Sequence, residues 1–132
     1  MNGIIYSYTR YQALADGILL RLEDFLDRQA LEGDLIVAAL RHSPSTRFAL
    51  GELVITCVAA AELSSDRVLQ SLIRHCQGDW GELPRSDRLT NESGLSGGDK
   101  LFSAYAYDDS PKFYIITEWN REATTVLLPE DN

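Results

Sequence analysis

Apolar and polar positions alternate most clearly in the last third of the chain, in three short runs. The runs cover residues 100–107, 112–118 and 124–128, and a period of two is typical of strands. The connections between them, 108–111 and 119–123, are of hairpin length. This arrangement predicts an antiparallel three-stranded meander.

The loop lengths also predict the register of the meander. Pairing Tyr107 with Lys112 and Glu118 with Thr124 sorts the side chains onto two faces, because successive strand residues point to opposite sides. The face expected to cover the helices carries Phe102, Ala104, Ala106, Phe113, Ile115, Thr117, Thr125 and Leu127. The opposite, more aromatic face carries Ser103, Tyr105, Tyr107, Lys112, Tyr114, Ile116, Glu118 and Thr124.

The middle of the chain predicts one strand followed by two helices. Residues 52–57 form an apolar, β-branched run that is typical of a strand. Ser65 is expected to cap a helix that ends at Cys76, with an apolar face at helical spacing. That face consists of Val68, Leu69, Leu72, Ile73 and Cys76. A second, short helix is predicted for 86–93, before a glycine-rich stretch at 94–98.

The first 45 residues predict a helical extension. Residues 4–8 are apolar and aromatic, which indicates a short strand. A helix is predicted over 10–29, with Gly17 as a point where it could divide. Its apolar stripe consists of Leu14, Ile18, Leu22, Phe25 and Leu26. The run at 35–40 is expected to form a buried strand in preference to a short apolar helix.

Together these elements predict an α+β fold with an antiparallel sheet, made of the C-terminal meander and one earlier strand, packed with helices. The order is β-α-α-β-β-β after the N-terminal helical segment. A chain of 132 residues has the size of one domain, so residues 1–45 are expected to pack on a unit formed by 46–132. Helices would then lie on both sides of the sheet. The N-terminal stripe would cover Tyr105, Tyr114, Ile116 and Val126.

The charge balance narrows the classes of partner. Twelve Lys and Arg against twenty Asp and Glu give a net charge of −8 and a pI near 4.6. Nucleic-acid binders need cations to neutralise phosphates, so direct DNA binding is not expected. A host protein with a basic surface, such as a nucleic-acid-binding defence enzyme, fits this charge. Self-association into a homodimer stays open.

Metal, cofactor and membrane chemistry have no signal in the sequence. Two cysteines and two histidines form neither a disulfide framework nor a cluster with metal-ligand spacing. We therefore expect no metal and no cofactor. The chain has no leader pattern and no run near the roughly 18 apolar residues of a membrane span. These features predict a soluble, cytoplasmic protein.

Two segments resemble known families. Motifs of the C-terminal two thirds resemble a family of short uncharacterised proteins from bacterial plasmids and phages. They are Gly78-Asp-Trp-Gly81, Ser103-Ala-Tyr105, Ile115-Ile-Thr-Glu118 and Thr124-Thr-Val-Leu-Leu-Pro129. The N-terminal Ile5-Tyr-Ser-Tyr-Thr-Arg10 and Asp16-Gly17 resemble a second uncharacterised family of mobile elements. Neither resemblance implies a known reaction.

The element order, with a histidine near the end of the first of two helices, also resembles the barnase, EndoU, colicin and RelE superfamily of RNases. That resemblance implies metal-independent cleavage, in which a base takes the proton of the 2′-hydroxyl and donors hold the phosphate. On this alternative His75 is the base and Lys100 stabilises charge. Ser103 or Tyr105 would hold the phosphate.

A structural interpretation competes with the catalytic one. His75 would then sit at the boundary of its helix and fix the turn that follows. Asp79, Trp80 and Gly81 would form a corner with a buried indole and a capping carboxylate. Thr117 and Thr125 are expected to lie opposite each other and bridge two strands.

The main hypothesis is a small, non-enzymatic accessory protein of a plasmid or phage that binds a host protein. Anti-defence, anti-restriction or anti-CRISPR inhibition is its concrete form. The metal-independent RNase is the alternative.

Overall fold

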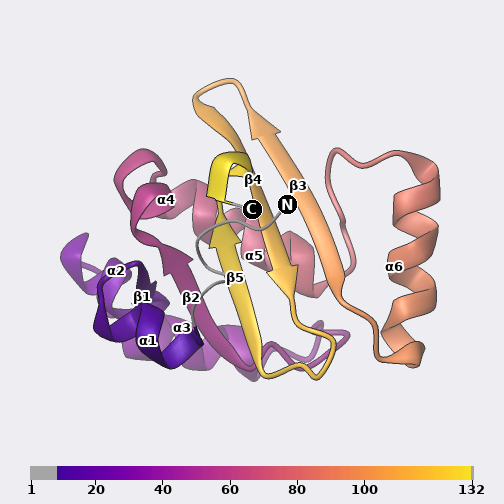
Figure 1. Ribbon diagram of the computed structural model, residues 1–132, viewed down its shortest axis with the longest axis horizontal. Helices are drawn as coiled ribbons and strands as arrows, with labels where there is room; N and C mark the ends of the chain where they lie inside the picture. The colour runs from indigo at the N-terminus through magenta and orange to yellow at the C-terminus, as the bar shows by residue number, and fades with distance from the viewer. Residues whose placement is uncertain (1–8, 132) are drawn as a thin grey trace.

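The computed structural model describes residues 9–131, so the strand expected at residues 4–8 lies outside the described part. Helices pack against one five-stranded sheet, which confirms the α+β class (Figure 1). The helices are α1 (Arg10–Ala15), α2 (Leu22–Arg28), α3 (Gly33–Arg41), α4 (Cys57–Glu62), α5 (Ser65–Cys76) and α6 (Arg85–Gly97). The strands are β1 (Leu19–Arg21), β2 (Glu52–Thr56), β3 (Leu101–Tyr107), β4 (Ser110–Thr117) and β5 (Ala123–Leu127). A 3-10 turn, η2 (Pro129–Asp131), follows β5.

The sheet has the order β1-β2-β5-β4-β3. The three C-terminal strands form the expected antiparallel meander. The earlier strand β2 joins the free side of β5 as expected, but this one pair runs parallel, so the sheet is mixed and not antiparallel throughout. Helices α4, α5 and α6 and the first two meander strands lie between β2 and β5 in the chain. Such a long crossover is what a parallel pair requires.

The register of the meander differs from the predicted one by a single residue. Tyr105 lies opposite Phe113 and Thr117 lies opposite Thr124. The first turn is tighter than expected because Ser110 already pairs with Tyr107, with a register shift between Tyr105 and Tyr107. A one-residue slip reverses the faces of a strand. The predicted faces of β3 and β5 are therefore wrong, while that of β4 is correct.

The N-terminal helix predicted over 10–29 is divided. Gly17 adopts φ +76, a left-handed conformation that glycine adopts at no steric cost. The chain then forms β1, which pairs antiparallel with β2, before α2 begins at Leu22. The apolar stripe is divided with it. Leu14 and Ile18 pack near Val54 on one side of β2, and the others pack on the opposite side.

The strand expected at 35–40 is wrong, because these residues belong to α3. Gly33, Val37 and Leu40 are its buried residues, and this spacing is helical. The turn before α3 is closed by the Asp27 carboxylate, which accepts a hydrogen bond from the Gly33 N–H at 2.9 Å. A short continuous apolar run does not distinguish a strand from a helix.

The main core joins both parts of the chain on one face of the sheet. It includes Leu22, Phe25 and Leu26 of α2, Val37 and Leu40 of α3, Leu53 and Ile55 of β2, Val68 and Leu72 of α5, and Phe113, Ile115 and Val126 of the meander. Helix α2 therefore shares the face of α5, and the expectation that its stripe covers Tyr114 and Ile116 is wrong. No helix of residues 9–131 is long and apolar enough to cross a membrane.

Two different sets of contacts cover the outer edge of β3. Gly81 forms a parallel bridge with Ala104. On α6, the Asn91 side chain donates to the Phe102 carbonyl at 2.7 Å and accepts from the Phe102 N–H at 3.0 Å. These contacts satisfy backbone groups that an open edge strand would leave free for aggregation. The helix that carries Asn91 extends beyond its predicted end at Ser93.

We predict that Gly33→Ala weakens the α2–α3 hairpin. An added Cβ would overlap the backbone oxygen and carbon of Glu23, and such overpacking costs roughly 1–3 kcal/mol. Gly97→Ala is the matched control, since its Cβ would meet only the Asp99 carboxylate at 3.6 Å. Urea denaturation measures both variants. Equal free energies of unfolding for the two would contradict the packing described here.

Candidate functional site

Among residues 9–131, the side chains with chemistry of a catalytic type centre on His75 in α5. This helix starts at the Ser64 cap, whose side chain accepts from the Arg67 N–H. Val68, Leu72 and Cys76 are buried in the core. Ser71 and His75, four residues apart, form a second buried stripe on the same helix. His75 is therefore fully enclosed, with 0% of its surface exposed.

A chain of hydrogen bonds runs through the imidazole and across the sheet. His75 Nδ1 lies 2.6 Å from Ser103 Oγ on β3, and Nε2 lies 2.9 Å from Thr117 Oγ1 on β4. Thr117 Oγ1 is 2.8 Å from Thr124 Oγ1 on β5. The Thr124 hydroxyl donates to the Leu50 carbonyl at 2.7 Å. We call His75, Ser103, Thr117 and Thr124 the polar chain.

The carbonyl at one end sets the direction of every proton in the polar chain. A carbonyl only accepts, so the single proton of Thr124 is committed to Leu50. Thr117 must then donate to Thr124, and its oxygen accepts from His75 Nε2–H. Nδ1 consequently carries no proton and accepts from the Ser103 hydroxyl. The geometry assigns the neutral Nε2–H tautomer to His75.

Aromatic rings close the space around the imidazole. Phe48 and Trp80 each meet the His75 ring edge-on, with centroids 5.3 and 5.6 Å away, and they stack on each other at 6.1 Å. The Trp80 indole donates to Glu92 on α6 at 2.8 Å, and Arg47 pairs with the same carboxylate. The enclosure is thus held from the 42–51 segment and from α6.

This enclosure determines the protonation of His75. Burial, together with a smaller effect of the positive charge of Arg121, lowers the pKa of His75 from its ordinary 6.5 to about 3. An imidazole of this kind stays neutral at physiological pH. A general base works best with a pKa near the operating pH, so this histidine is a poor proton acceptor.

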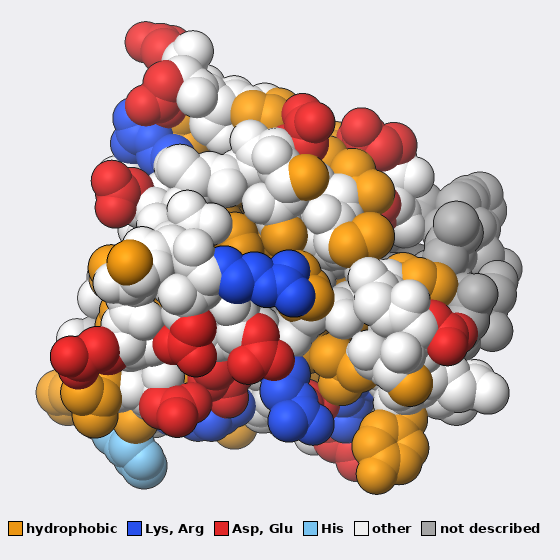
Figure 2. All heavy atoms as spheres, turned by 90° about the vertical axis from the view of Figure 1, so that its left-hand side faces the viewer, with side chains coloured by type: hydrophobic (Ala, Val, Ile, Leu, Met, Phe, Trp, Pro, Cys, Tyr) orange, Lys and Arg blue, Asp and Glu red, His pale blue; other side chains and the backbone are white. Residues whose placement is uncertain are grey.

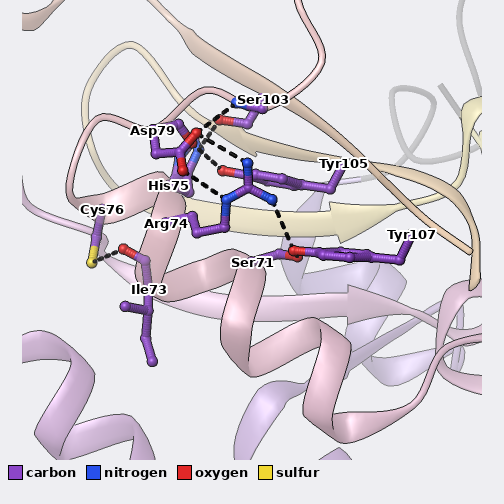
Figure 3. Close-up of polar contacts among 10 residues, drawn as sticks. Ser71, Ile73, Arg74, His75, Cys76, Asp79, Ser103, Tyr105 and Tyr107 are labelled. Carbon is purple, nitrogen blue, oxygen red and sulfur yellow. Dashed lines mark hydrogen bonds and ion pairs between the residues drawn. The ribbon is translucent and has the colours of Figure 1, made fainter.

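A second polar cluster lies next to His75 and Ser103 (Figure 3). Arg74 forms an ion pair with Asp79, with Nε 2.7 Å from Oδ2. The Arg74 guanidinium lies over the Tyr105 ring and donates to the Tyr107 hydroxyl at 3.0 Å. The Ser71 hydroxyl is 2.8 Å from the same phenol oxygen. These contacts hold the end of α5 against β3.

The ionisable groups of this cluster have shifted pKa values. The hydrogen bond from Arg74 holds the pKa of Asp79 below its ordinary value. The same ion pair raises the pKa of Arg74. Burial raises the pKa of Tyr105, whose hydroxyl donates to the Asp79 carbonyl at 2.7 Å. All three groups are thus fixed in their ordinary charge states.

The residues of the RNase alternative do not share one open site. Ser103 and His75 are in contact, but both are fully buried, as is Tyr105. Lys100 is exposed at the entrance to β3. The alternative requires the base and its donors to face a common substrate position. In this structure His75 and Ser103 are hydrogen-bonded to each other, and the Tyr105 hydroxyl donates to the Asp79 carbonyl.

The structural interpretation of the turn after α5 has more support. Trp80 is 3% exposed, and Asp79 caps the Gly81 N–H at 3.2 Å. An added Cβ at Gly81 would overlap the Ala104 carbonyl. Thr117 does bridge two strands, but its partner is Thr124 and not Thr125, which lies on the opposite face. The predicted register, wrong by one residue, had placed Thr124 on the face opposite to Thr117.

No metal site accompanies these groups, since residues 9–131 contain no cluster of three or more His, Cys, Asp or Glu able to hold an ion. Comparisons with family models, curated proteins and solved structures give no match. The resemblance to plasmid and phage proteins therefore stays a prediction. The chemistry of the site rests on its own geometry.

The buried imidazole predicts a pH dependence of stability. A histidine with a lowered pKa stabilises the fold fully above its unfolded pKa of 6.5, and this contribution is lost as the pH falls toward 3. Between pH 7 and pH 5 the free energy of unfolding should drop by about 2 kcal/mol. Urea denaturation at several pH values measures it. A flat profile would contradict the assignment.

The polar chain predicts a large difference between two adjacent threonines. Thr124→Val leaves the Leu50 carbonyl and the Thr117 proton without partners in the core, which costs roughly 1–3 kcal/mol. Thr125→Val keeps the β-branched shape and removes no side-chain hydrogen bond among the described residues, so its cost should stay within about 0.5 kcal/mol. Thermal and urea denaturation of the two variants compare them directly. Equal costs would count against the polar chain.

Proposed function

We propose that this protein is a non-enzymatic, acidic protein that acts by binding a basic surface of another protein. The observation that carries the proposal is the complete burial of His75 within a closed set of hydrogen bonds. His75 and its hydrogen-bonding partners, the side chains best suited to catalysis, thus stabilise the fold. Other molecules therefore contact the exposed side chains of the surface.

The surface is strongly anionic and little of its charge is neutralised locally. Five ion pairs among the described residues engage four of the twenty Asp and Glu side chains, since Glu52 takes part in two of them. Figure 2 shows carboxylates spread over the side of the molecule formed by α1, α2 and β1, with a group in its lower half that has Lys and Arg side chains among it. Such a field attracts a positively charged partner and speeds their encounter.

The turn between β4 and β5 supplies an anchor for such a partner. Trp119 is 64% exposed there, in a turn whose sequence also contains Glu118 and Glu122. Exposed tryptophans that enter a partner's pocket are frequent hot spots of binding. An exposed indole beside carboxylates suits an apolar pocket with a basic rim.

This turn is held in one conformation before any partner arrives. Arg121 has φ +60, which costs energy for a residue with a side chain. Its guanidinium donates to the carbonyls of Gly94 at 2.9 Å, Asp99 at 2.6 Å, Glu118 at 3.1 Å and Trp119 at 3.3 Å. A preorganised anchor loses little conformational entropy on binding.

The finer proposal is that the protein is a plasmid or phage accessory factor that inhibits a host defence enzyme. The basic nucleic-acid cleft of a restriction or CRISPR enzyme has the required charge. This proposal rests on the sequence resemblance and on the charge. Phage plating on cells that carry such a system, with and without the protein, tests it.

Affinity capture from bacterial host lysate tests the proposal of protein binding. We expect a stoichiometric basic partner that is retained at low salt and released as the salt concentration rises. Trp119→Ala should weaken binding of that purified partner at least about tenfold. The control Leu89→Ala removes another exposed apolar side chain, 56% exposed on α6, and should bind normally.

Two results would overturn the proposal. One is recovery of no stoichiometric partner at any salt concentration. The other is RNase activity in the purified protein that disappears in His75→Ala while the fold is retained.

A further inference from the structure

We propose that the outer face of α3 binds a second copy of this chain, as an antiparallel pair of helices related by a two-fold axis. Leu35 is 65% exposed on this face, and Ala38 and Ala39 beside it are also exposed. His42 follows directly after the helix. These positions recur at the i, i+3, i+4, i+7 spacing of a helix face that packs against another helix.

The charges of α3 are complementary to themselves in the antiparallel orientation. Asp34 stands in the first turn and Arg41 in the last turn. They are seven residues apart, or about two turns, so they lie on the same edge of the helix. In an antiparallel pair that edge meets the same edge of the second copy. Asp34 of each chain then lies beside Arg41 of the other, twice in one interface.

The side chains at the centre allow the two helices to come close. The midpoint between Asp34 and Arg41 falls next to Ala38, where small side chains permit an interaxial distance near 8 Å. Arg41 already donates to the Gly51 carbonyl through Nε and one terminal nitrogen. Its remaining N–H groups stay free for a carboxylate. Arg41 is thus positioned by its own chain before it meets the partner.

The size of the face sets the strength of the expected dimer. A nine-residue helix is about 13 Å long, so one helix pair buries less than the roughly 1,200–2,000 Å² of a stable interface. A net charge of −8 on each copy adds repulsion. We therefore expect a weak dimer that dissociates on dilution. This inference is independent of the proposed binding of another protein at Trp119.

Sedimentation equilibrium of the full chain, from about 5 μM to 1 mM, tests the dimer. We expect a monomer–dimer equilibrium, and Ala38→Arg should raise the dissociation constant at least about tenfold. The control Leu89→Asp alters an exposed apolar residue on α6, 56% exposed, and should dimerise normally. Circular dichroism confirms that both variants keep the fold.

A charge exchange tests the antiparallel orientation. Asp34→Arg and Arg41→Asp should each be monomeric alone, because like charges then face each other twice. Mixed in equal amounts, the two variants should form a heterodimer, since every pair becomes opposite in charge. A monomeric wild type at 1 mM would overturn the proposal. So would a dimer that Ala38→Arg leaves unchanged, or a mixture that stays monomeric.

Discussion

The fold depends on a single constraint, which is that the Leu50 carbonyl needs a donor in the core. The Thr124 hydroxyl is that donor, and successive hydrogen bonds then connect Thr124 to Thr117, Thr117 to His75 and His75 to Ser103. The polar chain connects the 42–51 segment, the three meander strands and α5. A buried network of this kind is favourable only when every member is satisfied. It therefore specifies how these elements pack against one another.

The same constraint decides what the site can do. A histidine that donates through Nε2 and accepts at Nδ1 has no free position for a substrate proton. The aromatic rings of Phe48 and Trp80 close the remaining space. Histidine and serine in contact are the residue types of a catalytic pair, but here the imidazole is closed off from solvent and its pKa is about 3. The side chains that other molecules can reach are those of the charged surface.

The sequence predicted the C-terminal elements well and the contacts between them less well. The three meander strands and α5 were identifiable because their apolar periodicity is strong. The β3–β4 register was missed because Ser110 and Pro111 look like loop residues but belong to β4. The β4–β5 register was missed because Ala123, predicted as the end of a loop, already belongs to β5. A one-residue slip hid the partnership of Thr117 with Thr124 and placed Ser103 on the wrong face. The identity of α3 was missed because an apolar run of six residues fits a helix or a strand.

The claim that the polar chain holds a neutral His75 in the core is tested most directly by the protonation state of this residue. Nitrogen-15 NMR of the imidazole distinguishes the two neutral tautomers and the charged form. We predict that His75 is the Nε2–H tautomer and that its nitrogen-15 chemical shifts stay unchanged from about pH 7.5 to pH 4.5, because the pKa of His75 lies near 3. A His75 ring that titrates near pH 6.5, or that carries its proton on Nδ1, would contradict the hydrogen-bond directions of the polar chain and the enclosure of the imidazole.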